Sequence, residues 1–136
     1  MRTTNTLLLT LLLAAGLSAS ALAQKTKAVL LVLPAPSEWK GHNGTLEITS
    51  VTNGVMQGAF TSNNAACGQT PAPIAGKLSP PKLTFAVMLP ACKTIMAWRG
   101  TFTDRAIATG VTTTQIQPDG TVSSGGLNGD LFSRTK

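Results

Sequence analysis

The sequence predicts an all-β protein whose folded part is a single eight-stranded, antiparallel, up-and-down β-barrel. Three observations lead to this prediction. From residue 38 onward Val, Ile, Thr and Phe dominate, and these residue types favour strands. No stretch there has the periodicity of an amphipathic helix, and turn residues recur about every ten positions. Short connections between that many strands favour a closed barrel, which leaves no exposed edge, over the alternative of an open sandwich.

Residues 1–23 are typical of a secretory signal peptide. Arg2 precedes an apolar run from Leu7 to Leu13, which is shorter than the ~20 residues of a membrane span. Ala21-Leu22-Ala23 then offers the small side chains of a cleavage site. A retained membrane anchor is the alternative, but no charged stop-transfer flank follows. We therefore expect cleavage after Ala23 and a secreted or periplasmic protein with no remaining membrane attachment.

The remaining chain, residues 24–136, has room for one domain and not for two. Without Arg2 it carries ten Lys and Arg against five acidic residues, a net charge of +5. These charges are scattered and tyrosine is lacking, which argues against a nucleic-acid partner. One His and two distant Cys predict no metal site. No Ser-His-Asp set or acidic dyad is present, so we expect no enzymatic activity.

Residues 24–37 form an N-terminal segment that is basic, then aliphatic, then interrupted by Pro34 and Pro36. Its aliphatic patch, residues 28–33, is either a short strand packed on the barrel or a hydrophobic arm used in dimerisation. The barrel domain, residues 38–136, follows.

The first three strands are marked by alternation and by one turn. Trp39 opens the first strand, and we expect its side chain in the core. Residues 45–51 alternate apolar and polar side chains, the period of a half-buried strand. Asn53-Gly54 suits a type I′ hairpin turn, in which both central residues need positive φ. Residues 55–62 return as the third strand.

The other strands are bounded by prolines and turn residues. The fourth and fifth span residues 72–78 and 82–89, separated by two prolines that cannot donate ladder hydrogen bonds. The sixth begins directly after Cys92, and one of its faces carries Thr94, Met96, Trp98, Gly100 and Phe102. The seventh spans residues 106–116, a Pro-Asp-Gly turn follows, and the last strand is expected over residues 127–134.

Cys67 and Cys92 are the only cysteines. In an exported protein such a lone pair most often forms one disulfide. Cys67 lies in the loop after the third strand and Cys92 at the start of the sixth, so we expect the bond to join the two ends of the barrel.

The strand segments are similar to the avidin and streptavidin family of biotin-binding barrels. The similar segments, which occur in the family's order, are WKGHNGTLEITSV, NGVMQGAFTS, LTFAV, IMAWRGTF, AIATGVTT and GDLFSR. The segment CGQTPAPIAG with its later partner Cys92 most resembles the dimeric, disulfide-containing branch typified by rhizavidin. The resemblance covers nearly all of residues 38–134. It implies an avidin-like fold, a Cys67–Cys92 disulfide, a homodimer, and biotin or a related small molecule as ligand rather than as a cofactor.

The resemblance also implies a ligand site at the barrel mouth. It makes Trp98 a wall of that site, Ser62 a hydroxyl for the ureido head of biotin, and Asp130 the acceptor for a ureido N–H. Asn43, together with His42, lies in the first ureido-binding loop. The residues alone allow other roles: Trp98 as a core residue, Ser62 as a solvated one, and Asp130 as the partner of an arginine, Arg99 or Arg105.

Several positions depart from the family pattern. Phe60 replaces a tyrosine and lacks its hydroxyl. Thr94 matches a hydroxyl near the carboxylate tail, and Met96 replaces a threonine that faces the thiophene sulfur. Leu89 and Val111 stand where the family presents tryptophan.

The tryptophan that a neighbouring family subunit contributes also has no counterpart, so three of four aromatic walls are absent. Loss of a buried Trp side chain costs about 3 kcal/mol or more, and each 1.4 kcal/mol is about tenfold in affinity. We expect reduced or altered biotin affinity. The alternative is an exported barrel without a ligand that acts as an interaction or inhibitor module.

Overall fold

The computed structural model describes residues 30–126 and 128–136, and its regular elements in that part of the chain are strands and two short 3-10 helices. The predicted signal peptide, residues 1–23, and residues 24–29 lie outside the described residues. The elements are β1 (Ser37–Lys40), β2 (Gly44–Thr52), β3 (Val55–Ser62), η1 (Ala65–Cys67), β4 (Ala72–Ser79), β5 (Lys82–Leu89), η2 (Pro90–Cys92), β6 (Thr94–Phe102), β7 (Ala106–Ile116), β8 (Val122–Ser124) and β9 (Asn128–Arg134). Neither described helix has the length and hydropathy that a membrane crossing requires.

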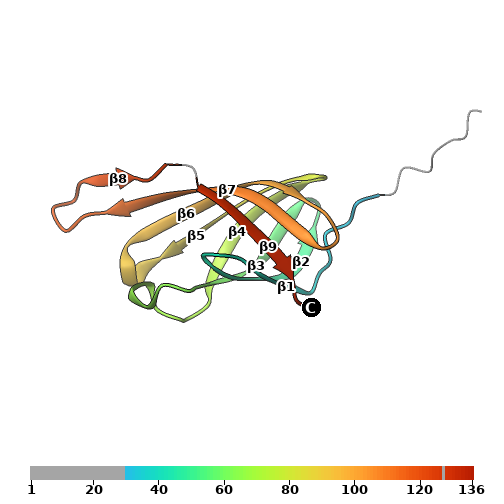
Figure 1. The fold of residues 1–136 in the computed structure, drawn as a ribbon, viewed down its shortest axis with the longest axis horizontal. Coiled ribbons are helices and arrows are strands. Elements are labelled where there is room, and N and C mark those ends of the chain that lie inside the picture. The colour runs from blue at the N-terminus through green and yellow to red at the C-terminus, as the bar shows by residue number, and fades with distance from the viewer. Residues whose placement is uncertain (1–29, 127) are drawn as a thin grey trace, which may run out of the picture.

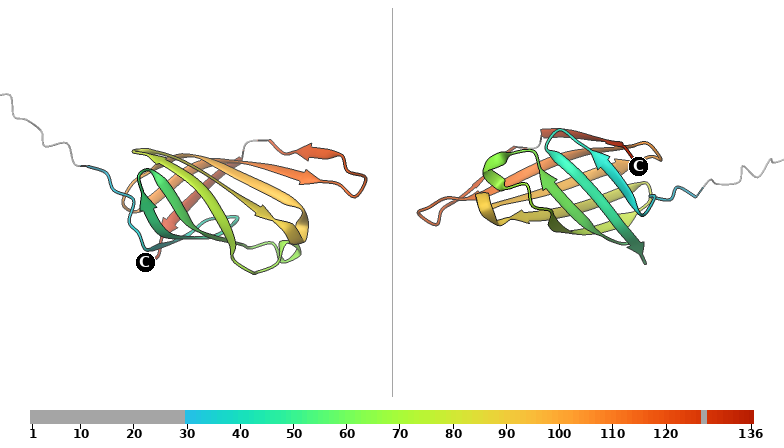
Figure 2. Two further views of the ribbon diagram at one scale, coloured as in Figure 1. Left: turned by 180° about the vertical axis from the view of Figure 1, so that it is seen from behind. Right: turned by 90° about the horizontal axis from the view of Figure 1, so that it is seen from below.

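Eight of the strands close into an antiparallel barrel, as predicted. Each strand from β1 to β7 pairs with the next, and β9 closes the ring by pairing with both β7 and β1. Figures 1 and 2 show these strands wrapping around a common interior. The closure excludes the open sandwich. Asn53 and Gly54 both have positive φ, 52° and 75°, as the predicted turn between β2 and β3 requires.

One strand of the described chain, β8, was not predicted. The first part of β7 pairs with β9, whereas its last residues pair with β8, Ile116 lying opposite Val122. The β7–β8 hairpin therefore projects beyond the barrel (Figure 1). All three residues of β8 are exposed, so no apolar alternation marks this strand in the sequence.

The interior is filled by the inward-facing residue of each alternating pair. Trp39, Leu46, Ile48, Phe60, Ile107 and Phe132 are all fully buried, and the core position predicted for Trp39 is confirmed. The described part of the N-terminal segment, residues 30–36, forms no strand. It nevertheless contributes Leu33 to the core, while Leu30 and Val32 remain exposed.

Cys67 and Cys92 form the predicted disulfide, with 4.5 Å between their Cα atoms. The expectation that it joins the two ends of the barrel is wrong. An even number of strands, β4 and β5, separates the two cysteines, so the chain returns to the end it left. The bond links η1 to η2 at one end of the barrel, the end from which the β7–β8 hairpin projects (Figure 2).

Candidate functional site

A pocket with a volume of about 500 Å³ opens at the end of the barrel that carries the disulfide. Its walls come from the turn after β1, the β3–β4 loop, η2, β6 and β7. The lining residues are His42, Asn43, Ser62, Asn63, Asn64, Ala66, Cys67, Cys92, Thr94, Met96, Thr113 and Gln115. The alternation of β6 explains two of them, because Thr94 and Met96 precede Trp98 on the inward face of that strand.

Next to this pocket lies a buried carboxylate, that of Asp130 on β9, whose residue is only 4% exposed. Its Oδ1 accepts the backbone N–H of His42 at 3.0 Å. Its Oδ2 accepts Asn43 Nδ2 at 2.8 Å and Trp98 Nε1 at 3.0 Å. A buried charge is tolerated when it is hydrogen-bonded in this way. Through Asp130, these hydrogen bonds connect the turn after β1 to β9 and to Trp98 on β6.

The alternative pairing of Asp130 with an arginine is not what the structure shows. Arg105 lies near Asp104, at 3.7 Å, and both side chains are exposed. Arg99 is exposed on the outer face of β6, whereas Asp130 faces the interior. The two side chains therefore lie on opposite faces of the sheet.

Trp98 is held in place by aromatic neighbours as well as by Asp130. Its ring stacks on Phe85 at a centroid distance of 4.7 Å and an interplanar angle of 13°. Phe60 contacts it at 4.8 Å in a tilted arrangement. Because Trp98 is 1% exposed, it belongs to the core and also orients the carboxylate beside the pocket.

The predicted site residues fall into two groups. Asn43, Ser62, Thr94 and Met96 line the pocket, and Asp130 accepts hydrogen bonds from Asn43 and Trp98. Phe60, Leu89 and Val111 instead lie in the hydrophobic core, none more than 3% exposed.

In the sheet, Leu89 pairs with Thr94 and Val111 pairs with Trp98. Both positions that carry tryptophan in the pattern described above are therefore packed next to the site, and neither borders the pocket.

Some lining residues were not predicted. Thr113 and Gln115 follow Val111 at two-residue spacing on β7, so the strand period could have identified them. Asn64 lies in the loop between β3 and η1, so the strand period could not identify it. Its side chain accepts the backbone N–H of Ala66 and caps η1, and its own N–H donates to Ser62 Oγ.

The pocket lining combines polar and apolar groups. It contains amide and hydroxyl groups together with Met96 and the disulfide, and His42 is its single titratable side chain. Within the described residues no group of three or more potential metal ligands occurs. Such a lining suits a small ligand with hydrogen-bonding groups and an apolar portion.

No protein-family model and no curated protein matches this sequence. Solved structures do. The structure of a bradavidin2–biotin complex is 36% identical, covers 76% of this chain and 100% of that chain, and has a TM-score of 0.69. Apo shwanavidin is 25% identical, with coverage of 77% and 98% and a TM-score of 0.62. A rhizavidin–biotin complex is 19% identical, with coverage of 76% and 93% and a TM-score of 0.61, and supports the fold alone.

Proposed function

This chain belongs to the avidin family, and we propose that it is an exported protein that binds biotin non-enzymatically, with reduced or altered affinity. One observation carries the proposal. A barrel 36% identical to a protein solved with biotin holds a buried carboxylate, Asp130, hydrogen-bonded to Asn43 and Trp98 beside a pocket.

The polar groups have hydrogen-bonding capacity left for a ligand. An ionised carboxylate offers about four acceptor sites, and Asp130 uses three of them. A ureido N–H can use the remaining one. Ser62 Oγ accepts the N–H of Asn64, so its hydroxyl hydrogen stays available to a ligand acceptor.

Reduced affinity follows from the residues that replace the expected aromatic walls. Leu89 and Val111 are smaller than tryptophan and pack into the core, so they enclose less apolar ligand surface. Phe60 has no hydroxyl to offer the ureido oxygen. Each difference removes a contact that would favour the bound ligand.

The proposal is tested by retention of the mature, oxidised protein on biotin-agarose. We expect retention that free biotin reverses. An unretained protein, or one that free biotin does not elute, would contradict the proposal, and the former result would favour the ligand-free interaction module.

Export is part of the proposal. It is supported by the apolar run and by the Ala-Leu-Ala site at residues 21–23. Intact-mass measurement of protein recovered from the periplasm or culture fluid should give a chain that begins at Gln24. Recovery of the uncleaved chain in membranes would contradict it.

We also propose a homodimer formed through a set of exposed apolar side chains on the outer face of β5 to β8, called the outer apolar face; Arg99, on the outer side of β6, does not belong to this set. Met88, Ile95, Ile116 and Val122 are exposed there. Met88 lies opposite Ile95, and Ile116 opposite Val122. None of these four side chains is charged, so two copies with the same positive net charge meet there without repulsion between facing residues.

The dimer is tested by light scattering of the eluted protein. Ile95→Glu should convert a dimer to a monomer, because it places a charge in the outer apolar face. Val55→Glu is the control, since Val55 is also exposed but lies on β3. A monomeric wild-type protein, or equal effects of the two substitutions, would contradict the proposal.

A further inference from the structure

The register of the sheet gives the pocket an inner and an outer end. Asp130 lies opposite Thr109 on β7. Gln115, which lines the pocket, lies farther along the same strand, about 20 Å from Thr109 at the usual rise of a strand residue. Their spacing is even, so both side chains lie on the same face of β7. A ligand whose head group bonds to Asp130 therefore extends along the pocket toward Gln115.

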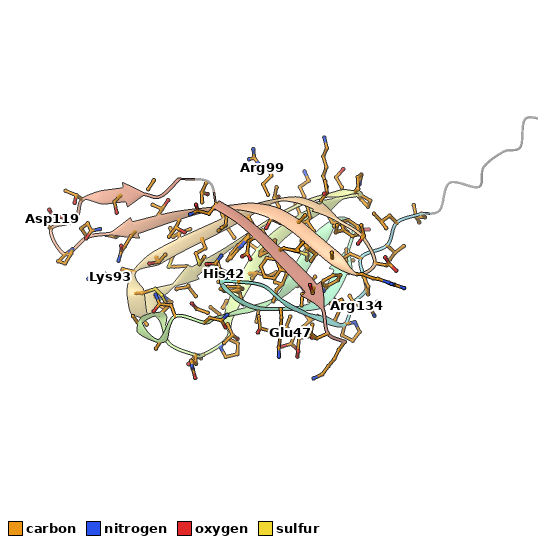
Figure 3. All side chains as sticks on the ribbon, in the orientation of Figure 1. His42, Glu47, Lys93, Arg99, Asp119 and Arg134 are labelled. Carbon is orange, nitrogen blue, oxygen red and sulfur yellow. A yellow bond between two sulfur atoms is a disulfide. The ribbon has the colours of Figure 1, made fainter. Side chains whose placement is uncertain are left out.

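Thr94 on β6 marks the same outer end. It pairs directly with Gln115, and both residues line the pocket. Figure 3 agrees with this direction. His42, whose backbone N–H donates to Asp130, lies toward the middle of the barrel, whereas Lys93, which precedes Thr94, lies toward the β7–β8 hairpin. We call Thr94 and Gln115 the outer pair.

The outer pair has unequal hydrogen-bonding capacity left for a ligand. The Thr94 hydroxyl donates its hydrogen to the carbonyl of Cys92 at 3.0 Å, so the hydroxyl oxygen can take part in a further bond only as an acceptor. The Gln115 side chain is exposed, and it bonds to no other side chain or backbone group among the described residues. Its amide can therefore both donate and accept.

A carboxylate at the outer end would have no charged partner in the pocket lining. The one titratable lining side chain is that of His42, which belongs to the turn bonded to Asp130. Lys93 and Asp119, on turns near the outer end, are exposed and absent from the lining. A carboxylate there would lose part of its hydration without compensation by a cation.

We propose that Thr94 and Gln115 are specificity-determining residues that select biotin whose carboxyl group is joined to an amine as a secondary amide. The amide N–H donates to Thr94 Oγ1, and the amide carbonyl accepts from Gln115 Nε2. A free carboxylate has no N–H to offer Thr94. Lysine supplies such an amine in polypeptides, so the ligand class is a polypeptide that carries biotin on a lysine side chain. The inference rests on the proposed biotin binding and adds the chemical form that is bound.

Calorimetric titration with biotin N-methylamide, biotin methyl ester and free biotin tests the proposal. The amide and the ester share the head group and are both neutral, but only the amide has an N–H at the tail. The wild-type protein should bind the amide about three- to tenfold more tightly than the ester, the equivalent of one hydrogen bond. It should also bind the amide more tightly than free biotin at about 0.15 M salt, which screens the positive net charge of the protein.

Four variants assign the effect to the outer pair. Thr94→Val removes the acceptor and should abolish the preference for the amide over the ester, whereas Thr94→Ser keeps the hydroxyl and should retain it. Gln115→Leu, at an exposed position, should weaken binding of the amide about two- to fivefold through loss of the bond to its carbonyl. Gln117→Leu is the matched control, because Gln117 lies on the same hairpin but does not line the pocket. It should leave all three dissociation constants unchanged.

The inference would be overturned by equal binding of the amide and the ester, or by tighter binding of free biotin than of the amide. A preference that persists in Thr94→Val, or an amide affinity unaffected by Gln115→Leu, would also overturn it. Each of these results leaves the proposed function standing, because biotin derivatives still bind. If none of the three ligands bound, both the proposed function and this inference would be refuted.

Discussion

Asp130 is the residue on which the candidate site depends most. It accepts three donors from two segments, two from the turn after β1 and one from β6 through Trp98. The family resemblance could predict that Asp130 and Trp98 belong to one site, although β7 lies between their strands, β9 and β6. The bond from the backbone N–H of His42 could not be predicted, because it depends on the conformation of the turn and not on the type of its side chain.

Asp130→Ala should lower the free energy of unfolding by about 1–3 kcal/mol, because it leaves a buried indole N–H without an acceptor. It should also weaken biotin binding. Urea unfolding monitored by Trp fluorescence measures the first effect. Asp119→Ala is the matched control, since Asp119 is exposed and accepts its hydrogen bonds from Thr121 within its own turn. Equal stability of the two variants would argue against a structural role for the Asp130 bonds.

At the scale of the elements, the alternation of apolar and polar residues predicted the strands that have an apolar face. It missed β8, all of whose residues are exposed. Residues 45–51 and 82–89 have clear inward and outward sides. The β8 segment consists of exposed residues that pair only with the end of β7. Its structure depends on the length of β7 and on the turn that follows, and hydrophobic periodicity reports neither.

The disulfide links η1 to η2 and forms part of the pocket wall. Replacing both cysteines by alanine should lower the free energy of unfolding by about 3.5 kcal/mol, the loop-closure contribution for a separation of 25 residues. Denaturant unfolding of the variant and of the oxidised wild type measures the difference. Identical midpoints and slopes would show that the bond does not contribute to stability.

Gly100 allows β6 and β7 to approach closely. A Cβ at this position would overlap the carbonyl oxygen of Ala108, a backbone atom that cannot move without disturbing the strand pairing. Gly100→Ala should therefore lower the melting temperature clearly. Gly129→Ala should change it little, because a Cβ there meets nothing within 4 Å. A smaller effect at Gly100 than at Gly129 would contradict this assignment.

The C-terminal residues are attached to β1 through Glu38. The hydroxyl of Thr135 donates to Glu38 Oε1 at 2.8 Å, and Lys136 Nζ lies 3.5 Å from Oε2. The Thr135 bond, followed by the charge of Lys136, lowers the pKa of Glu38 below its ordinary value of 4.5. A lowered pKa means that the contribution of the ionised Glu38 carboxylate to stability is fully present above pH 4.5 and is lost as the pH falls through the lower folded value.

Thr135→Val should raise the pKa of Glu38 toward its ordinary value, because it removes the largest cause of the shift. Titration of the Glu38 carboxyl by NMR measures this change. An unchanged pKa would indicate that the charge of Lys136 alone maintains the shift.

For the whole molecule, the closed barrel could be predicted from the number of strands and their short connections, but the position of the disulfide could not be derived correctly without counting strand directions. The site was predicted in part. Ser62, Thr94 and Met96 line the pocket, whereas Leu89 and Val111 are packed in the core. Which inward-facing residues border the opening depends on how far each strand extends past its neighbours.

The central claim is that Asp130 and its partners form a biotin site, and calorimetric titration of the mature, oxidised protein tests it most directly. We predict saturable heat with one biotin per chain, and an affinity that falls at least about tenfold in Asp130→Ala, the equivalent of one lost hydrogen bond to a charged group. Absence of heat at high micromolar biotin, or an affinity unchanged by Asp130→Ala, would contradict it.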